Sequence, residues 1–99
     1  MYISSVRARI SKDPPGALAW AQGIAKFVQK KTGIEVQTLV RVGATQDIVW
    51  LSRYPGLAAY EKSLEQMQSD AEYWAYLKDA EAKGFFDTPN VEAGIWREI

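Results

Sequence analysis

The sequence contains neither cysteine nor histidine among its 99 residues. Without cysteine there is no disulfide framework, thiolate nucleophile, cysteine-ligated zinc or iron–sulfur cluster. Without histidine there is no Ser–His or Cys–His dyad, and no imidazole ligand for haem or zinc. Any metal would have to bind carboxylate and carbonyl oxygens, and no motif indicates such a site. We therefore expect no metal and no other cofactor.

An excess of one charge and a long apolar run are also missing. The 12 basic and 12 acidic residues give no net charge that would attract nucleic acid or an anionic membrane. No apolar run approaches the ~20 residues of a membrane span, and the N-terminus leads into a strand-like segment rather than a signal peptide. Gly-rich phosphate loops and an RNA-recognition signature are absent. We expect a soluble, cytoplasmic, single-domain protein (residues 1–99) with no nucleic-acid or membrane partner.

Apolar periodicity predicts the element order β-α-β-β-α-α-β. Pro-Gly precedes an apolar helix face twice, in P-G-A-L-A-W at 15–20 and P-G-L-A-A-Y at 55–60. Pro-Gly starts many helices, but two copies also suit the halves of a split β-α-β domain. We therefore expect an α+β, ferredoxin-like fold, with helices on one face of a four-stranded antiparallel sheet. The strands are expected at 2–10, 34–42, 47–53 and 91–99, and the helices at 14–32, from 55 to about 68, and from a capping box at 69–72 to about 83.

Side-chain alternation along these strands predicts two unlike sheet faces. One face is almost continuously apolar and should be covered by the helices. The other face mixes charges with apolar residues on central strands, which is typical of an interaction surface. A second copy of the same sheet would cover it and form a homodimer, although single exposed apolar residues are also normal. The expected dimer interface contains Leu39, Arg41, Val49, Leu51, Arg53 and Trp96.

All five arginines fall on expected strands, including Arg7 and Arg9 on the first one. Guanidinium groups bind carboxylates and phosphates in a bidentate manner, so these two are candidate ligand-binding residues. The alternative is ion pairing at the interface with carboxylates of the same face. One hairpin register that preserves alternation places Arg41 opposite Asp47 and Glu35 opposite Arg53, and these two opposite-charge pairs favour it.

Aromatic residues are the other candidates for a binding site. Trp50, Tyr54, Tyr60 and Tyr73 lie where the helices meet the sheet, and together they would line a pocket for a flat apolar ligand. The same spacing also produces ordinary core packing, which is favoured for Tyr60 and for Trp20. The sequence does not separate pocket from core at Trp50 and Tyr73.

One strand-to-helix segment resembles a known group of proteins. The segment V-W-L-S-R-Y-P-G-L-A-A-Y at 49–60, together with D-A-E-Y at 70–73 and G-I-W at 94–96, resembles the dimeric α/β-barrel superfamily. It is most similar to the NIPSNAP-like and antibiotic-biosynthesis-monooxygenase-like branches. The resemblance covers nearly the whole chain and implies two ferredoxin-like protomers that pair sheet to sheet into a homodimeric α/β barrel.

The resemblance leaves the activity open, because this fold hosts many functions. Monooxygenases of this type share a strand tryptophan, here Trp50, but they also use an asparagine and often a histidine. The only asparagine here is Asn90, and the axial histidine of the haem-degrading branch is missing too. Three hypotheses follow. The first is a homodimer that binds a small apolar or aromatic ligand between helices and sheet. The second is a cofactor-free monooxygenase or isomerase. The third is a non-catalytic dimeric adaptor.

Overall fold

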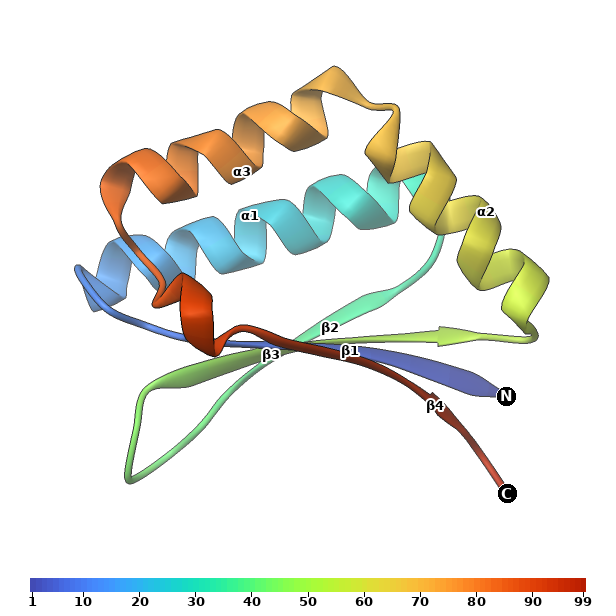
Figure 1. Ribbon diagram of the computed structural model, residues 1–99, viewed down its shortest axis with the longest axis horizontal. Helices are drawn as coiled ribbons and strands as arrows, with labels where there is room; N and C mark the ends of the chain where they lie inside the picture. The colour runs from blue at the N-terminus through green and yellow to red at the C-terminus, as the bar shows by residue number, and fades with distance from the viewer.

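The computed structural model describes residues 1–99 and has the element order that the sequence predicts (Figure 1). A short 3-10 turn at Thr88–Asn90 precedes the last strand. The elements are β1 (Tyr2–Arg9), α1 (Pro14–Thr32), β2 (Val36–Val40), β3 (Asp47–Tyr54), α2 (Leu57–Gln68), α3 (Ala71–Lys83) and β4 (Glu92–Arg97).

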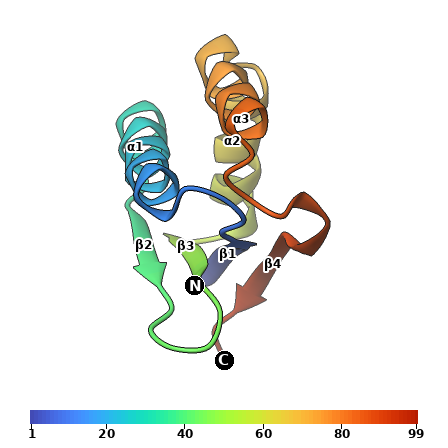
Figure 2. The same cartoon turned by 90° about the vertical axis from the view of Figure 1, so that its left-hand side faces the viewer.

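The four strands form one antiparallel sheet in the order β2-β3-β1-β4. The central strands β3 and β1 come from the two halves of the chain, which is the ferredoxin-like arrangement. All three helices lie on one side of this sheet, and the other side is bare (Figure 2). The expected fold class is therefore confirmed for the chain. None of the helices is long and apolar enough to cross a membrane.

Local capping explains where the helices begin and end. The Asp13 side chain accepts a hydrogen bond from the Gly16 amide at the start of α1, and Gly33 ends α1 with a φ of 73°. Asp70 caps α3 by accepting from two backbone amides of its first turn. The expected capping box at 69–72 is therefore shifted, because the cap is Asp70 and not Ser69.

The β2–β3 register is the predicted one, but β2 is shorter than expected. Val36 pairs with Ser52, and Val40 pairs with Ile48. The same register continues to Arg41, whose backbone amide donates a hydrogen bond to the Asp47 carbonyl oxygen at 2.9 Å. Arg41 itself lies beyond the end of β2, so the expectation that every arginine is on a strand is wrong.

The most deeply buried residues of α1 lie in its first half. Ala17 and Ala21 are fully buried on α1. Ala17 forms a buried cluster with Ala80 and Phe85. Toward the opposite end of α1, the helices and the sheet enclose open space.

Candidate ligand-binding cavity

A cavity of about 510 Å³ lies between the helices and the sheet, within the usual size range of small-molecule sites. All three helices and all four strands contribute to its wall. Its lining consists of Ser4, Val6, Trp20, Ile24, Ala25, Val28, Val36, Trp50, Ser52, Tyr54, Tyr60, Ser63, Leu64, Met67, Tyr73, Leu77, Ala93, Gly94 and Ile95.

The lining contains no charged side chain, and 15 of its 19 residues are hydrophobic. Its polar groups are neutral hydroxyls from serines and tyrosines. A charged ligand would lose its hydration here without gaining a counter-charge, which is costly. The cavity therefore favours neutral, largely apolar molecules.

Two tryptophans form flat walls in this cavity, and their polar atoms are already used. Nε1 of Trp50 donates to the Ala21 carbonyl oxygen, and Nε1 of Trp20 donates to the Tyr76 carbonyl oxygen, both at 3.1 Å. The two rings meet edge to face with their centroids 6.2 Å apart. These hydrogen bonds fix the indoles in place, so they offer apolar ring surface to a ligand rather than a free donor.

The tyrosine hydroxyls provide the polar character of the cavity. Burial raises the pKa of Tyr73 above its ordinary value of 10.0, because the phenolate would be poorly solvated. Tyr73 is therefore protonated at neutral pH and can donate a hydrogen bond, but it is a poor base. No aspartate, glutamate or lysine lines the cavity to act in its place.

The exposed part of the cavity lining lies on β4 and α2. The lining residues that are most exposed are Ala93 and Ile95 on β4 and Leu64 on α2. A ligand entering here meets apolar side chains first.

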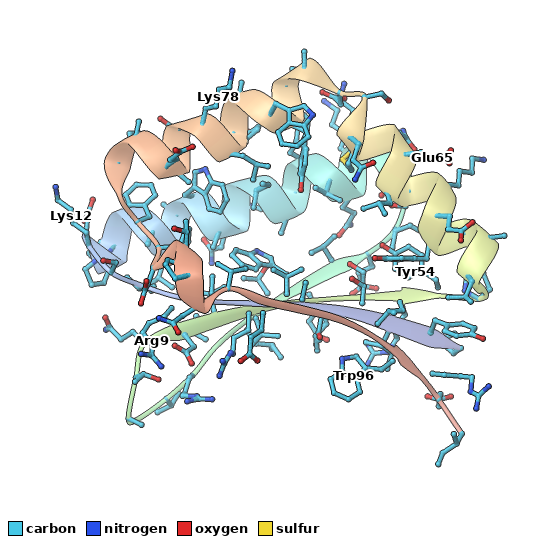
Figure 3. The ribbon with its side chains drawn as sticks, viewed as in Figure 1. Arg9, Lys12, Tyr54, Glu65, Lys78 and Trp96 are labelled. Carbon is cyan, nitrogen blue, oxygen red and sulfur yellow. The ribbon has the colours of Figure 1, made fainter.

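The structure brings four of the sequence-predicted ligand residues together and separates the other two. Trp50, Tyr54, Tyr60 and Tyr73 all line the cavity. Trp20 and Tyr60, which the sequence favours as core residues, lie on the cavity wall. Arg7 and Arg9 are not part of it, because their side chains extend from the bare face of the sheet (Figure 3 labels Arg9).

On that bare face, three arginines surround the carboxylate of Asp47, which is 2% exposed. Arg7, Arg9 and Arg41 approach its oxygens to 3.7, 3.6 and 3.4 Å, and Arg7 also pairs with Glu92 at 2.9 Å. The Asp47 oxygens receive no hydrogen bond of good geometry, so attraction between full charges holds the group together. Arg7 and Arg9 therefore form ion pairs with carboxylates of the same face, which is the alternative to ligand binding by these two residues.

The residues expected at a dimer interface also lie on the bare face. Leu39 is 44% exposed and Trp96 63% exposed, while Val49 and Leu51 are partly covered. Nε1 of Trp96 donates to Ser5 Oγ at 2.8 Å, which holds the indole against the sheet. Arg53 stands opposite Glu35 in the register, but the two side chains form no ion pair in the chain.

Sequence reasoning missed the serines of the cavity. Ser63 is 7% exposed and lies one turn after Tyr60 on the inner face of α2. Its position three residues from a predicted pocket tyrosine is the signal that places it on the same face. Ser4 and Ser52 face the cavity from paired positions on β1 and β3.

Solved structures that resemble this chain share its fold over nearly their whole length. An uncharacterized NIPSNAP domain protein from Burkholderia xenovorans is 13% identical with a TM-score of 0.80, covering 100% of this chain and 95% of that one. A NIPSNAP family protein with unknown function from Agrobacterium tumefaciens is 13% identical with a TM-score of 0.76, covering 99% and 87%. SnoaB, a cofactor-independent oxygenase from Streptomyces nogalater, is 13% identical with a TM-score of 0.73, covering 99% and 93%.

These matches confirm the resemblance at the level of the fold. The chain has the ferredoxin-like α+β fold, and its structural neighbours include NIPSNAP proteins and a cofactor-independent oxygenase. No protein-family model matches the sequence, and no curated protein matches it. Function must therefore be argued from the cavity and not from relatives.

Proposed function

We propose that this protein binds a small, neutral, apolar or aromatic molecule in the cavity between its helices and its sheet. The observation that carries this proposal is the lining itself, which has no charged group and is dominated by hydrophobic side chains. Trp20 and Trp50 are held by backbone hydrogen bonds, so the wall is preformed and needs little ordering when a ligand binds.

A matched pair of ligands tests this proposal by isothermal titration calorimetry. 2-Naphthol and 2-naphthoate share one ring system but differ in charge at neutral pH. We expect 2-naphthol to bind with a Kd on the order of 10–100 µM. The carboxylate should bind at least about tenfold more weakly, because nothing in the cavity compensates its desolvation.

Variants at the opening provide the control. Ala93→Trp places a large ring at the cavity mouth on an edge strand and should abolish binding of 2-naphthol. Ala58→Trp adds the same ring to the exposed surface of α2, outside the lining, and should bind 2-naphthol normally. Equal affinity for the two ligands, or unchanged binding in Ala93→Trp, would contradict the proposal.

The functional unit in this proposal is a homodimer formed through the bare face of the sheet. Support comes from the exposed Leu39 and Trp96 on that face and from the absence of any element of the chain that covers it. A chain of 99 residues buries only about two-thirds of its surface alone, so a partner copy would add stability.

A cofactor-free oxygenase or isomerase is the alternative function, and its support is the fold shared with SnoaB. Chemistry of that kind begins with removal of a proton from the substrate, and this cavity lacks a carboxylate or amine to accept it. A substrate acidic enough to ionise unaided would be required. Oxygen consumption with a panel of acidic phenols separates this alternative from binding alone.

The third possibility, an adaptor with no ligand, is displaced by saturable binding of 2-naphthol.

A further inference from the structure

Asp47 is the only charged residue that is buried in this chain. Its side chain is 2% exposed, and neither carboxylate oxygen receives a hydrogen bond of good geometry. Burying a carboxylate is costly unless positive charge compensates for its lost hydration. Here three guanidinium groups supply that charge, and together they exceed what one carboxylate requires.

The arginine cluster around Asp47 contains one more positive charge than its carboxylates neutralise. Arg7 contacts two carboxylates, Asp47 at 3.7 Å and Glu92 at 2.9 Å. Arg9 and Arg41 contact only Asp47, at 3.6 and 3.4 Å. Three arginines therefore face two carboxylates, and the surplus positive charge belongs to Arg9 and Arg41.

Arg9 and Arg41 reach Asp47 from opposite sides within the sheet. Arg9 of β1 lies directly opposite Asp47 in the β1–β3 register. On the other side of β3, the Arg41 backbone amide donates to the Asp47 carbonyl oxygen. Nε of Arg9 faces Oδ1 of the carboxylate, and Nη1 of Arg41 faces Oδ2. One buried carboxylate therefore holds two guanidinium groups close to each other.

Most N–H groups of these two arginines face solvent. Each guanidinium carries five N–H donors, and the two side chains are 45% and 47% exposed. Their one side-chain hydrogen bond in the chain runs from Nη1 of Arg41 to Oγ1 of Thr45 at 3.2 Å. Figure 3 shows Arg9 on the side of the sheet away from the helices. The donors are therefore accessible to a second anion.

We propose that Arg9 and Arg41 bind a phosphate group, with Asp47 as the buried positioning residue that holds them together. A tetrahedral phosphate has oxygens on several sides and can accept from two guanidinium groups at once, whereas a carboxylate presents both of its oxygens to one. The Asp47 oxygens have no accessible surface, so they do not touch the anion. Their role is to hold both arginines in place, which lowers the ordering cost of binding.

A titration with phosphate, followed by the backbone amide NMR signals of Arg9 and Arg41, tests this site. Sodium phosphate replaces sodium chloride at constant ionic strength, because salt screening alone changes the surroundings of exposed charges. We expect saturable shifts with a Kd on the order of 1–10 mM for the wild-type protein. Acetate should bind at least about threefold more weakly. Phenyl phosphate separates the two sources of the group: binding at least as tight as that of inorganic phosphate assigns a phosphate monoester, and weaker binding assigns the free ion.

Arg53 provides a matched control on the same face of the sheet. Arg9→Gln and Arg41→Gln should each weaken phosphate binding at least about fivefold. Arg53→Gln removes the same charge, but Arg53 pairs with Ile3 in the register and forms no ion pair with Asp47, so its effect should stay below about twofold. Asp47→Asn should also weaken binding, although it makes the cluster more positive, because the arginines lose the group that holds them together.

Three results would overturn the inference. They are the absence of saturable shifts in the wild-type protein, an equal loss of affinity in Arg53→Gln, and unchanged binding in both Arg9→Gln and Arg41→Gln. Tighter phosphate binding in Asp47→Asn would overturn the positioning role of Asp47. Normal far-UV circular dichroism of each variant excludes misfolding as the cause of a changed affinity. The site and the cavity lie on opposite faces of the sheet, so failure here leaves the proposed function standing.

Discussion

At the scale of single residues, the two strand tryptophans of this chain have unlike roles. Trp50 faces the helices and uses its N–H on the Ala21 carbonyl oxygen, whereas Trp96 faces the bare side and uses its N–H on Ser5. Side-chain alternation along the strand predicts the face on which each lies. It does not predict the hydrogen-bond partner, because that partner comes from a distant segment and depends on how the helix approaches the sheet.

Tyr73 gives a prediction that belongs to this scale. Its pKa is raised by burial, so spectrophotometric titration should show one tyrosine that ionises above 10, and Tyr73→Phe should remove that transition. The folded protein holds this proton more tightly than the unfolded chain does. The contribution of Tyr73 to stability is therefore complete below pH 10 and decreases as the pH rises through the folded pKa. An unchanged titration curve in Tyr73→Phe would contradict this assignment.

At the scale of elements, the signals that act within one helix or one strand pair predicted the elements and most of their ends. Asp13 and Gly33 mark the ends of α1 because capping is a local interaction of the backbone with its neighbours. Alternation limits the register of β2 and β3 to those that keep side-chain parity, and opposite charges such as Arg41 and Asp47 favour the one that forms. The end of β2 was predicted too late, at residue 42, because Arg41 leaves the strand and turns toward Asp47 and Thr45. That contact depends on the hairpin loop.

A glycine inside α1 and the glycine that caps its end provide a matched pair for a stability prediction. Gly23 lies inside α1 with nothing within 4 Å of an added Cβ, so Gly23→Ala should increase the free energy of unfolding by about 0.5–1 kcal/mol. Gly33 has open space as well but a φ of 73°, so Gly33→Ala should decrease it by about 1 kcal/mol. Urea denaturation measures both values. A stabilising Gly33→Ala would show that the left-handed cap does not form.

At the scale of the whole molecule, the two faces of the sheet were predictable, and so were four aromatic residues of the cavity, Trp50, Tyr54, Tyr60 and Tyr73, but not the full extent of its lining. Alternation separates an apolar face from a mixed one, and the three helices cover the apolar face as expected. Whether aromatics such as Trp20 and Tyr60 fill a core or line a cavity depends on the spacing between helix and sheet layers. That spacing depends on how all three helices pack together on the sheet, which no single stretch of sequence specifies.

Exposed leucines on different faces test the proposed dimer. Leu39 is 44% exposed on the bare sheet face, and Leu57 is 46% exposed on α2. Sedimentation of the wild-type protein should give twice the chain mass of 11.1 kDa. Leu39→Glu should shift it to the monomer, because a charge opposite an apolar partner surface is costly, while Leu57→Glu should leave the dimer intact. A wild-type monomer, or a dimer that persists in Leu39→Glu and dissociates in Leu57→Glu, would contradict assembly through the sheet.

The most direct test of the binding cavity uses the four tryptophans as position markers. Their indole N–H signals are resolved in ¹H–¹⁵N spectra and can be assigned by single Trp→Phe variants. Trp20 and Trp50 line the cavity, whereas Trp74 and Trp96 lie outside it. During titration with 2-naphthol, the signals of Trp20 and Trp50 should shift together and saturate, and those of Trp74 and Trp96 should stay in place. No shift at Trp20 and Trp50, or saturable shifts confined to Trp96, would contradict a ligand site between the helices and the sheet.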